Sequence, residues 1–168
     1  MRVGLLIIGL LIGALLRGQT LKEVREQYEI ANHKESVAEL LANSKGFSDP
    51  VLLGYKASAK MLLAKHYWNP YAKFASFVEG RNELEALISS NLYNFELRYL
   101  RLIIQCNCPI FLGYNKQINE DKLFVIQHFQ QFLGLPENRE FADKVLSYLK
   151  TLNVFSKQEI ELLLVRIN

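Results

Sequence analysis

The sequence has little of what catalytic and metal-binding sites are commonly built from. Its 168 residues include only two cysteines and three histidines. It contains no His-Glu-x-x-His zinc motif, no Gly-x-Ser-x-Gly nucleophile elbow and no glycine-rich phosphate loop. These absences favour a protein without a metal site or a cofactor, and they favour a binding role over catalysis.

Neither sign of charge is in excess once the N-terminal segment is set apart. The chain has 20 basic and 17 acidic residues, and two of the basic ones, Arg2 and Arg17, lie within residues 1–19. Residues 20–168 therefore carry 18 basic and 17 acidic side chains. Such a balance leaves no electrostatic footprint for nucleic acid or for an anionic membrane. We expect no nucleic-acid partner, and a membrane contact only where the N-terminal segment is retained.

The first 19 residues resemble an export signal. A short positive start precedes Val3 to Leu16, an unbroken run of apolar residues and glycine, as in secretory signal peptides. As a helix this run spans roughly 21 Å, which is shorter than the ~30 Å hydrocarbon core of a bilayer. Cleavage after Gly18 would place Leu16 at the minus-three position, where small residues are preferred. The segment predicts a periplasmic or secreted protein, with a membrane anchor through residues 3–16 as the alternative.

Helix start and stop signals recur along the remaining residues. Thr20 to Glu23 and Ser156 to Glu159 match the capping box, in which side chains and backbone amides bond reciprocally. Asp49-Pro50 joins an N-cap to a proline suited to the first helical turn. No stretch alternates strictly between apolar and polar residues. We expect an all-α fold of seven or eight helices, with antiparallel neighbours joined by short loops and with residues 20–168 as one domain.

Part of the helical pattern matches a repeat family. Leu53-Gly54 and Ala86 match small and apolar packing positions, and Leu97 and Leu100 follow as the apolar anchors of the next helix. On these residues the segment from Leu53 to Tyr99 resembles tetratricopeptide-type helix pairs. It departs from the family's usual proline and glycine, where it has Asn91 and Arg101. The resemblance implies a short array of antiparallel helix pairs with a concave face for a peptide or protein partner. The whole chain is also similar to small exported helical proteins of bacteria, a likeness that implies no activity.

Two aromatic segments are candidates for a binding surface. His66, Tyr67 and Trp68 lie in a connection before Pro70, where functional residues tend to gather, and Tyr114 lies in a second aromatic loop. If the helices pair as expected, both segments lie at ends of neighbouring helices and could meet. They would then form a pocket for an acidic or peptide ligand. The alternative is that the aromatic side chains only close the end of the helical array.

Arg98 and Arg101 are the cations expected near that surface. They are three residues apart and therefore neighbours on one helix. Planar guanidinium groups suit carboxylates, so the pair could clamp an acidic ligand. The alternative is a structural ion-pair network with carboxylates of the preceding helix, which are Glu79, Glu83 and Glu85.

Cys106 and Cys108 are the redox candidates. Two residues apart on a helix, their side chains point about 200° away from each other, so a disulfide requires that the helix has ended. The spacing also differs from the Cys-x-x-Cys of redox sites. Three roles stay open: inert packing thiols, a structural disulfide and a reactive pair.

Three functional hypotheses follow from these patterns. The first is a non-catalytic envelope interaction or scaffold module that binds a protein or peptide through His66, Tyr67, Trp68, Arg98, Arg101 and Tyr114. The second is a small envelope enzyme or redox protein that uses His66 or the Cys106/Cys108 pair. The third is a membrane-anchored assembly factor that keeps its N-terminal segment.

Overall fold

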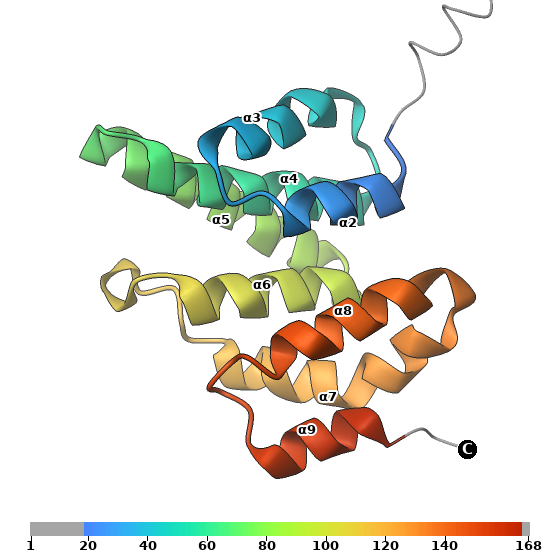
Figure 1. The fold of residues 1–168 in the computed structure, drawn as a ribbon. Coiled ribbons are helices and arrows are strands. Elements are labelled where there is room, and N and C mark those ends of the chain that lie inside the picture. Colours follow the sequence, from blue (N-terminus) through green and yellow to red (C-terminus); the bar gives the residue numbers. More distant parts are fainter. Residues whose placement is uncertain (1–18, 166–168) are drawn as a thin grey trace, which may run out of the picture.

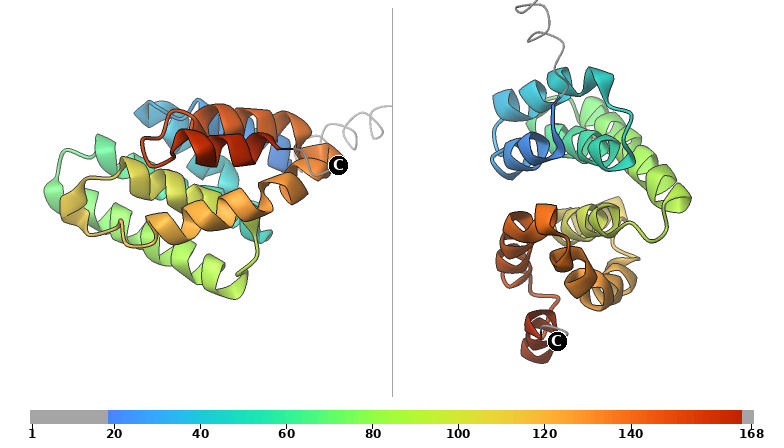
Figure 2. Two further views of the ribbon diagram at one scale, coloured as in Figure 1. Left: turned by 90° about the horizontal axis from the view of Figure 1, so that it is seen from below. Right: turned by 90° about the vertical axis from the view of Figure 1, so that its right-hand side faces the viewer.

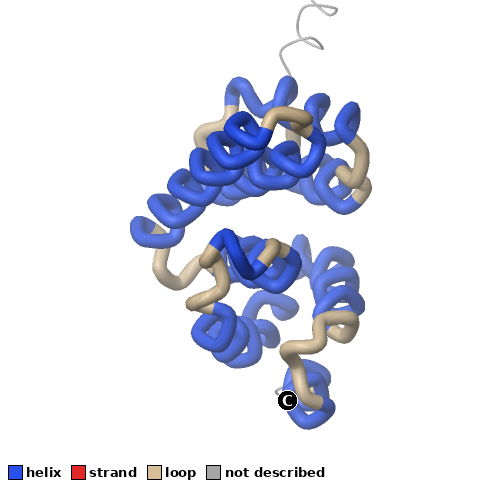
Figure 3. The backbone as a smooth tube through the Cα atoms, turned by 90° about the vertical axis from the view of Figure 1, so that its left-hand side faces the viewer, coloured by secondary structure: helices blue, strands red, loops and turns tan. Residues whose placement is uncertain are grey.

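The computed structural model describes residues 19–165, in which helices joined by loops are the only regular elements and no strand occurs (Figures 1 and 3). Its eight α-helices are α2 (Leu21–Glu29), α3 (Lys34–Asn43), α4 (Pro50–Leu63), α5 (Pro70–Ser90), α6 (Phe95–Asn107), α7 (Ile118–Gly134), α8 (Arg139–Leu149) and α9 (Lys157–Leu164). Four short 3₁₀ turns accompany them: Ser44–Gly46, Ala64–His66, Ile110–Leu112 and Pro136–Asn138. The predicted all-α fold is confirmed.

Side-chain caps begin several of these helices where the sequence predicts them. The Thr20 hydroxyl accepts a hydrogen bond from the Glu23 amide, and the Glu23 carboxylate accepts one from the Thr20 amide at 2.8 Å. Ser156 and Glu159 form the same reciprocal pair before α9. The Asp49 carboxylate accepts from the Val51 amide at 2.8 Å. These bonds satisfy amide groups that a helix start would otherwise leave without acceptors.

The helices form two layers, α2 to α5 and α6 to α9, and the chain passes between them at the turn after α5 (Figures 1 and 2). Two glycines allow close approach of neighbouring helices. A Cβ atom on Gly80 of α5 would lie 2.4 Å from the Ala57 carbonyl oxygen of α4. A Cβ atom on Gly54 of α4 would lie 2.4 Å from Leu97 Cδ2 of α6. At Gly80 the close atom belongs to the backbone, so that contact depends on glycine, whereas at Gly54 the Leu97 side chain would have to shift.

Buried side chains join the two layers. The larger cluster contains Val24 of α2, Tyr55 of α4, Leu100 of α6, Val145 of α8 and Leu163 of α9. A second cluster is built from α4, α5 and α6, together with Tyr114. The layers are therefore joined by apolar packing along part of their facing surfaces, which fixes the edges of the site described next.

The predicted export signal covers residues 1–19, of which residues 1–18 lie outside the described part of the chain. Within residues 19–165, no helix has the length and apolar composition needed to cross a membrane. The tetratricopeptide resemblance stays a prediction.

Candidate functional site

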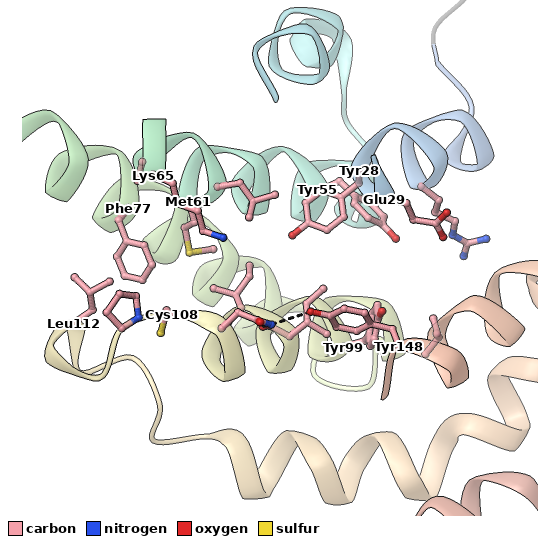
Figure 4. A pocket seen from close by; sticks show the side chains of 18 of the residues that line it. Tyr28, Glu29, Tyr55, Met61, Lys65, Phe77, Tyr99, Cys108, Leu112 and Tyr148 are labelled. Carbon is pink, nitrogen blue, oxygen red and sulfur yellow. Dashed lines mark hydrogen bonds between the residues drawn. The ribbon is translucent and has the colours of Figure 1, made fainter. Parts of the chain in front are cut away.

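A groove of about 1140 Å³ lies between the two helical layers (Figure 4). Helices α2, α4 and α5 line one side, and α6, α8 and the 3₁₀ turn at Ile110–Leu112 line the other. Its lining is mostly aromatic and aliphatic, with polar groups placed at the two ends. Ligand sites in proteins are typically apolar concavities of ~300–1,000 Å³ with a few polar groups. The groove is slightly larger than that range.

One end of the groove is lined by four tyrosines that face one another across the layers. Tyr28 and Tyr55 come from the first layer, and Tyr99 and Tyr148 from the second (Figure 4). The Tyr148 hydroxyl accepts a hydrogen bond of 2.9 Å from the Asn107 amide. Burial raises the pKa of both Tyr28 and Tyr99, so their phenols stay neutral and present an apolar ring with a polar tip.

A buried ion pair ties the layers together at the same end. Arg25 of α2 donates to both carboxylate oxygens of Glu96 of α6, at 2.8 and 2.6 Å. The Tyr55 hydroxyl donates to the same carboxylate at 2.5 Å, and Arg25 also donates to the Asn138 side chain. The Arg25 guanidinium carbon lies 4.3 Å from the centroid of the Phe141 ring. This closed polar cluster fixes the spacing of α2 and α6 beside the groove.

The other end of the groove is apolar, with cations at its mouth. Met61, Phe77 and Leu112 line it (Figure 4). Lys65 and Lys73 also belong to the lining, and both are exposed. Neither lysine forms an ion pair with another residue of the described range 19–165, whereas Arg25 and Lys144, the other lining cations, are paired with Glu96 and Glu29.

Arg98, Arg101 and Tyr114 lie together, but in a buried network of carboxylates. Arg101 donates to both Asp121 oxygens at 2.6 and 2.7 Å and to Glu85 at 2.8 Å. Tyr114 donates to the other Glu85 oxygen at 2.6 Å. Arg98 pairs with Asp121 and with Glu120. Because both guanidinium groups are buried and paired within the chain, this geometry favours the structural alternative, and their binding role stays a prediction.

The counterions of this network differ from those expected. Of the three glutamates suggested by the sequence, only Glu85 contacts an arginine of the pair. Glu79 and Glu83 each lie 2.6 Å from Lys60 instead. The main partner is Asp121 of α7, which is fully buried and 20 residues further along the chain than Arg101.

His66, Tyr67 and Trp68 lie beside the groove mouth. The residues that flank them, Lys65 and Pro70, line the groove, but these three do not. His66 and Tyr67 are half-buried, and Trp68 is almost completely exposed. The second aromatic loop reaches the same mouth through Phe111 and Leu112, so the two aromatic segments lie at one end of the molecule (Figure 1).

Cys106 and Cys108 are both free thiols and half-buried. Cys106 belongs to the last turn of α6, whereas Cys108 follows the helix and lines the groove. The Cys108 thiol lies 3.3 Å from the Tyr114 carbonyl oxygen, to which it donates. Burial raises the pKa of the Cys106 thiol to about 11 and also raises that of Cys108. Among the described residues, no group of three or more His, Cys, Asp or Glu side chains could hold a metal ion.

Sequence reasoning missed most of the groove lining. Tyr28, Tyr99 and Tyr148 come from three different helices and carry no local motif. Lys65 and Lys73 flank the aromatic connection, and their position beside Trp68 is a signal that could have suggested them. Comparisons with protein-family models, with curated proteins and with solved structures found no match to this chain.

Proposed function

We propose that this chain is a non-catalytic binding module of the cell envelope, and that the groove between its helical layers is the ligand site. The observation that carries this proposal is the groove itself, a large apolar concavity with tyrosines at one end and two exposed lysines at the other. Apolar lining supplies most of the affinity of such sites, and the few polar groups orient the ligand. The envelope location rests on residues 1–19 and stays a prediction from the sequence.

The ligand that fits this lining best is an elongated amphiphile with an apolar chain and an anionic head group. The chain would run from Met61 and Leu112 past Phe77 and Ile104 toward Ser147 and Tyr148 of α8, away from water. Lys65 and Lys73 at the mouth would supply the positive charge that a carboxylate or phosphate head group requires. The lining contains the acidic residues Glu29 and Asp143, but both come from the tyrosine end, on α2 and α8. A bound amphiphile would therefore have its apolar chain inside the groove and its head group at the lysines of the mouth.

The chemistry of the lining supports binding over catalysis. A thiol attacks as its thiolate, and burial raises the pKa of the Cys108 thiol that faces the groove. The raised pKa values of Tyr28 and Tyr99 likewise keep these groups protonated. Neutral, poorly acidic groups are suited to packing and hydrogen bonding, and they make weak nucleophiles and weak general bases.

A protein or peptide partner, as the sequence suggests, is the second candidate. An amphipathic helix can lay its apolar face into a hydrophobic groove between helices. The groove has helices on both sides, which is the lining that such a peptide would meet. A peptide would be expected to contact exposed side chains beyond the groove, including Trp68. The two candidates are separated by whether a ligand without any peptide bonds binds on its own.

Titration calorimetry of the full chain with dodecanoate, below its micellar range, tests the proposal. We expect one ligand per chain. Ser147→Trp, which places a large ring on an exposed lining residue of α8, should weaken binding by about tenfold or more, equivalent to ~1.4 kcal/mol. Thr151→Trp is the matched control, because Thr151 is an exposed hydroxyl residue just beyond α8 that does not line the groove, and it should bind like the wild type.

Two results would contradict the amphiphile proposal. One is the absence of any heat of binding to the wild-type chain. The other is equal affinity in both tryptophan variants, which would place dodecanoate elsewhere on the protein. A chain that ignores dodecanoate but binds amphipathic helical peptides in a Ser147-dependent manner would favour the second candidate.

A further inference from the structure

Five large apolar side chains protrude into solvent around the groove mouth. We call them the aromatic edge: Trp68, Tyr71, Phe74, Ile110 and Phe111. Their exposed fractions range from 61% for Phe74 to 99% for Trp68. Single exposed apolar residues are ordinary in soluble proteins, but a group of this size at one place marks an interaction surface.

The aromatic edge is formed by two connections and by the start of α5, which carries Tyr71 and Phe74, all at the same end of the fold. The first joins α4 to α5, and the second joins α6 to α7; both lie on the left in Figure 1 and in the left view of Figure 2. Phe74 from the start of α5 and Phe111 from the second connection line the same groove. The protruding side chains therefore surround one opening, although 37 positions of sequence separate Phe74 from Phe111.

The two connections and the start of α5 carry lysine but no acidic residue. Residues 64–74 contain Lys65 and Lys73, residues 108–116 contain Lys116, and neither range contains an aspartate or a glutamate. All three lysines are exposed and have no ion-pair partner within residues 19–165. The rest of the domain has nearly equal numbers of basic and acidic residues, so this end is more positively charged than the domain as a whole. Its charge is complementary to an anionic surface.

We propose that the aromatic edge docks onto an anionic lipid bilayer. Tryptophan and tyrosine favour the boundary between lipid head groups and acyl chains, where an apolar ring and a polar tip are both satisfied. Phe74, Ile110 and Phe111 enter the acyl region, and Lys65, Lys73 and Lys116 contact anionic head groups. Docked this way, the groove mouth opens toward the bilayer. The bilayer contact shares Lys65 and Lys73 with the proposed head-group site but does not require an amphiphile in the groove, so it can hold even if the proposed amphiphile is wrong.

The protein contains its own probe for this contact, because Trp68 is its only tryptophan. The experiment measures Trp68 emission of the full chain with vesicles of equimolar phosphatidylcholine and phosphatidylglycerol. We expect a blue shift on vesicle addition and quenching by brominated acyl chains. Both depend on the environment of Trp68 itself, so they do not arise from residues 1–18 contacting lipid elsewhere.

Two variant pairs make the test specific. Lys65→Glu/Lys73→Glu should reduce vesicle affinity by on the order of tenfold or more, by the charge contribution expected for lysines at such a surface. Lys45→Glu/Lys150→Glu changes the net charge by the same amount, at exposed lysines that do not line the groove. Its vesicle affinity should stay within about twofold of the wild type. Circular dichroism and thermal unfolding confirm that each variant is folded.

A displaced tryptophan tests the location. In Trp68→Phe/Tyr93→Trp the probe moves to the turn after α5, where Tyr93 is also highly exposed. The turn lies at the far end of a 21-residue helix, roughly 30 Å away at 1.5 Å per residue. Emission from position 93 should not change on vesicle addition.

Several outcomes would overturn the proposal. An equal blue shift at position 93 would mean that lipid binding is unspecific. A Trp68 shift with pure phosphatidylcholine that equals the shift with anionic vesicles would remove the electrostatic component. A blue shift that depends on protein concentration in the absence of vesicles would mean that the aromatic edge contacts a second copy of the chain. The absence of a shift under all conditions would mean that it contacts neither a bilayer nor a second copy.

Discussion

Arg25 and Glu96 form a buried bidentate ion pair between α2 and α6, with nitrogen–oxygen distances of 2.8 and 2.6 Å. Because the two residues belong to different helical layers, this pair sets the spacing of the layers beside the tyrosine end of the groove. Tyr55 and Asn138 complete the hydrogen bonding of the pair, so each charged group is compensated although it lies away from water.

Removing one member of this pair should be strongly destabilising. In Glu96→Ala the Arg25 charge stays buried without its counterion, and such losses typically cost about 3–5 kcal/mol. Urea unfolding followed by circular dichroism measures the change. Glu140→Ala is the control, because Glu140 pairs with Lys22 at 2.9 Å on the exposed surface, and the unfolding midpoint should hardly move. Equal losses in the two variants would contradict a layer-joining role for Arg25 and Glu96.

The contact of α4 with α5 should be sensitive to a single methyl group. Gly80→Ala places a Cβ atom 2.4 Å from the Ala57 carbonyl oxygen and 2.9 Å from Met61 Cγ, so the helices must separate. Overpacking of this kind costs about 1–3 kcal/mol, although alanine has the better helix propensity.

Gly46→Ala is the comparison for that substitution, since a Cβ atom on Gly46 would have no neighbouring atom within 4 Å. Its free energy of unfolding should stay within about 0.5 kcal/mol of the wild type. Equal stability of Gly80→Ala and Gly46→Ala would contradict the close packing of α5 on α4.

The cysteines should label slowly in the folded chain at neutral pH. Burial raises the pKa of Cys106 to about 11, so only a small fraction is thiolate near pH 8. The labelling rate with iodoacetamide should rise with pH toward that value, whereas the unfolded chain should follow an ordinary thiol with a pKa of ~8.5. Mass spectrometry of the peptides separates Cys106 from Cys108.

The raised pKa of Cys106 also affects stability. A group whose pKa is raised by folding contributes stability that is present below its unfolded pKa of ~8.5 and is lost as the pH rises through about 11. Cys106→Ala should therefore lose less stability than the wild type between these pH values. Rapid labelling of Cys106 at neutral pH, or an isolated Cys106–Cys108 disulfide, would contradict the packing role.

The helices could be predicted from the sequence because their signals are local. Thr20 with Glu23, Ser156 with Glu159, and Asp49 with Pro50 each act within one helical turn, and each cap forms as expected. The groove could not be predicted, because its polar ends depend on partners far apart in sequence. Arg25 and Glu96 are 71 residues apart, and no local pattern selects one carboxylate among many as the partner.

The candidate site was predicted only in part for a related reason. A net charge is an average over the domain, so it concealed three lysines that have no ion-pair partner within residues 19–165, and the absence of acidic residues at residues 64–74 and 108–116. Spacing placed Arg98 and Arg101 together, but it could not distinguish a ligand clamp from an internal network. That distinction depends on Asp121, which is brought to both arginines by the packing of α7 on α6.

We infer that the groove holds an apolar chain whose anionic head lies at Lys65 and Lys73. The most direct measurement compares the dissociation constants of dodecanoate and dodecanol for the wild-type chain and for Lys65→Glu/Lys73→Glu. We predict that dodecanoate loses about tenfold or more in affinity, ~1.4 kcal/mol, while dodecanol is unaffected. Unchanged dodecanoate binding in the variant, or equal losses for both ligands, would contradict the claim.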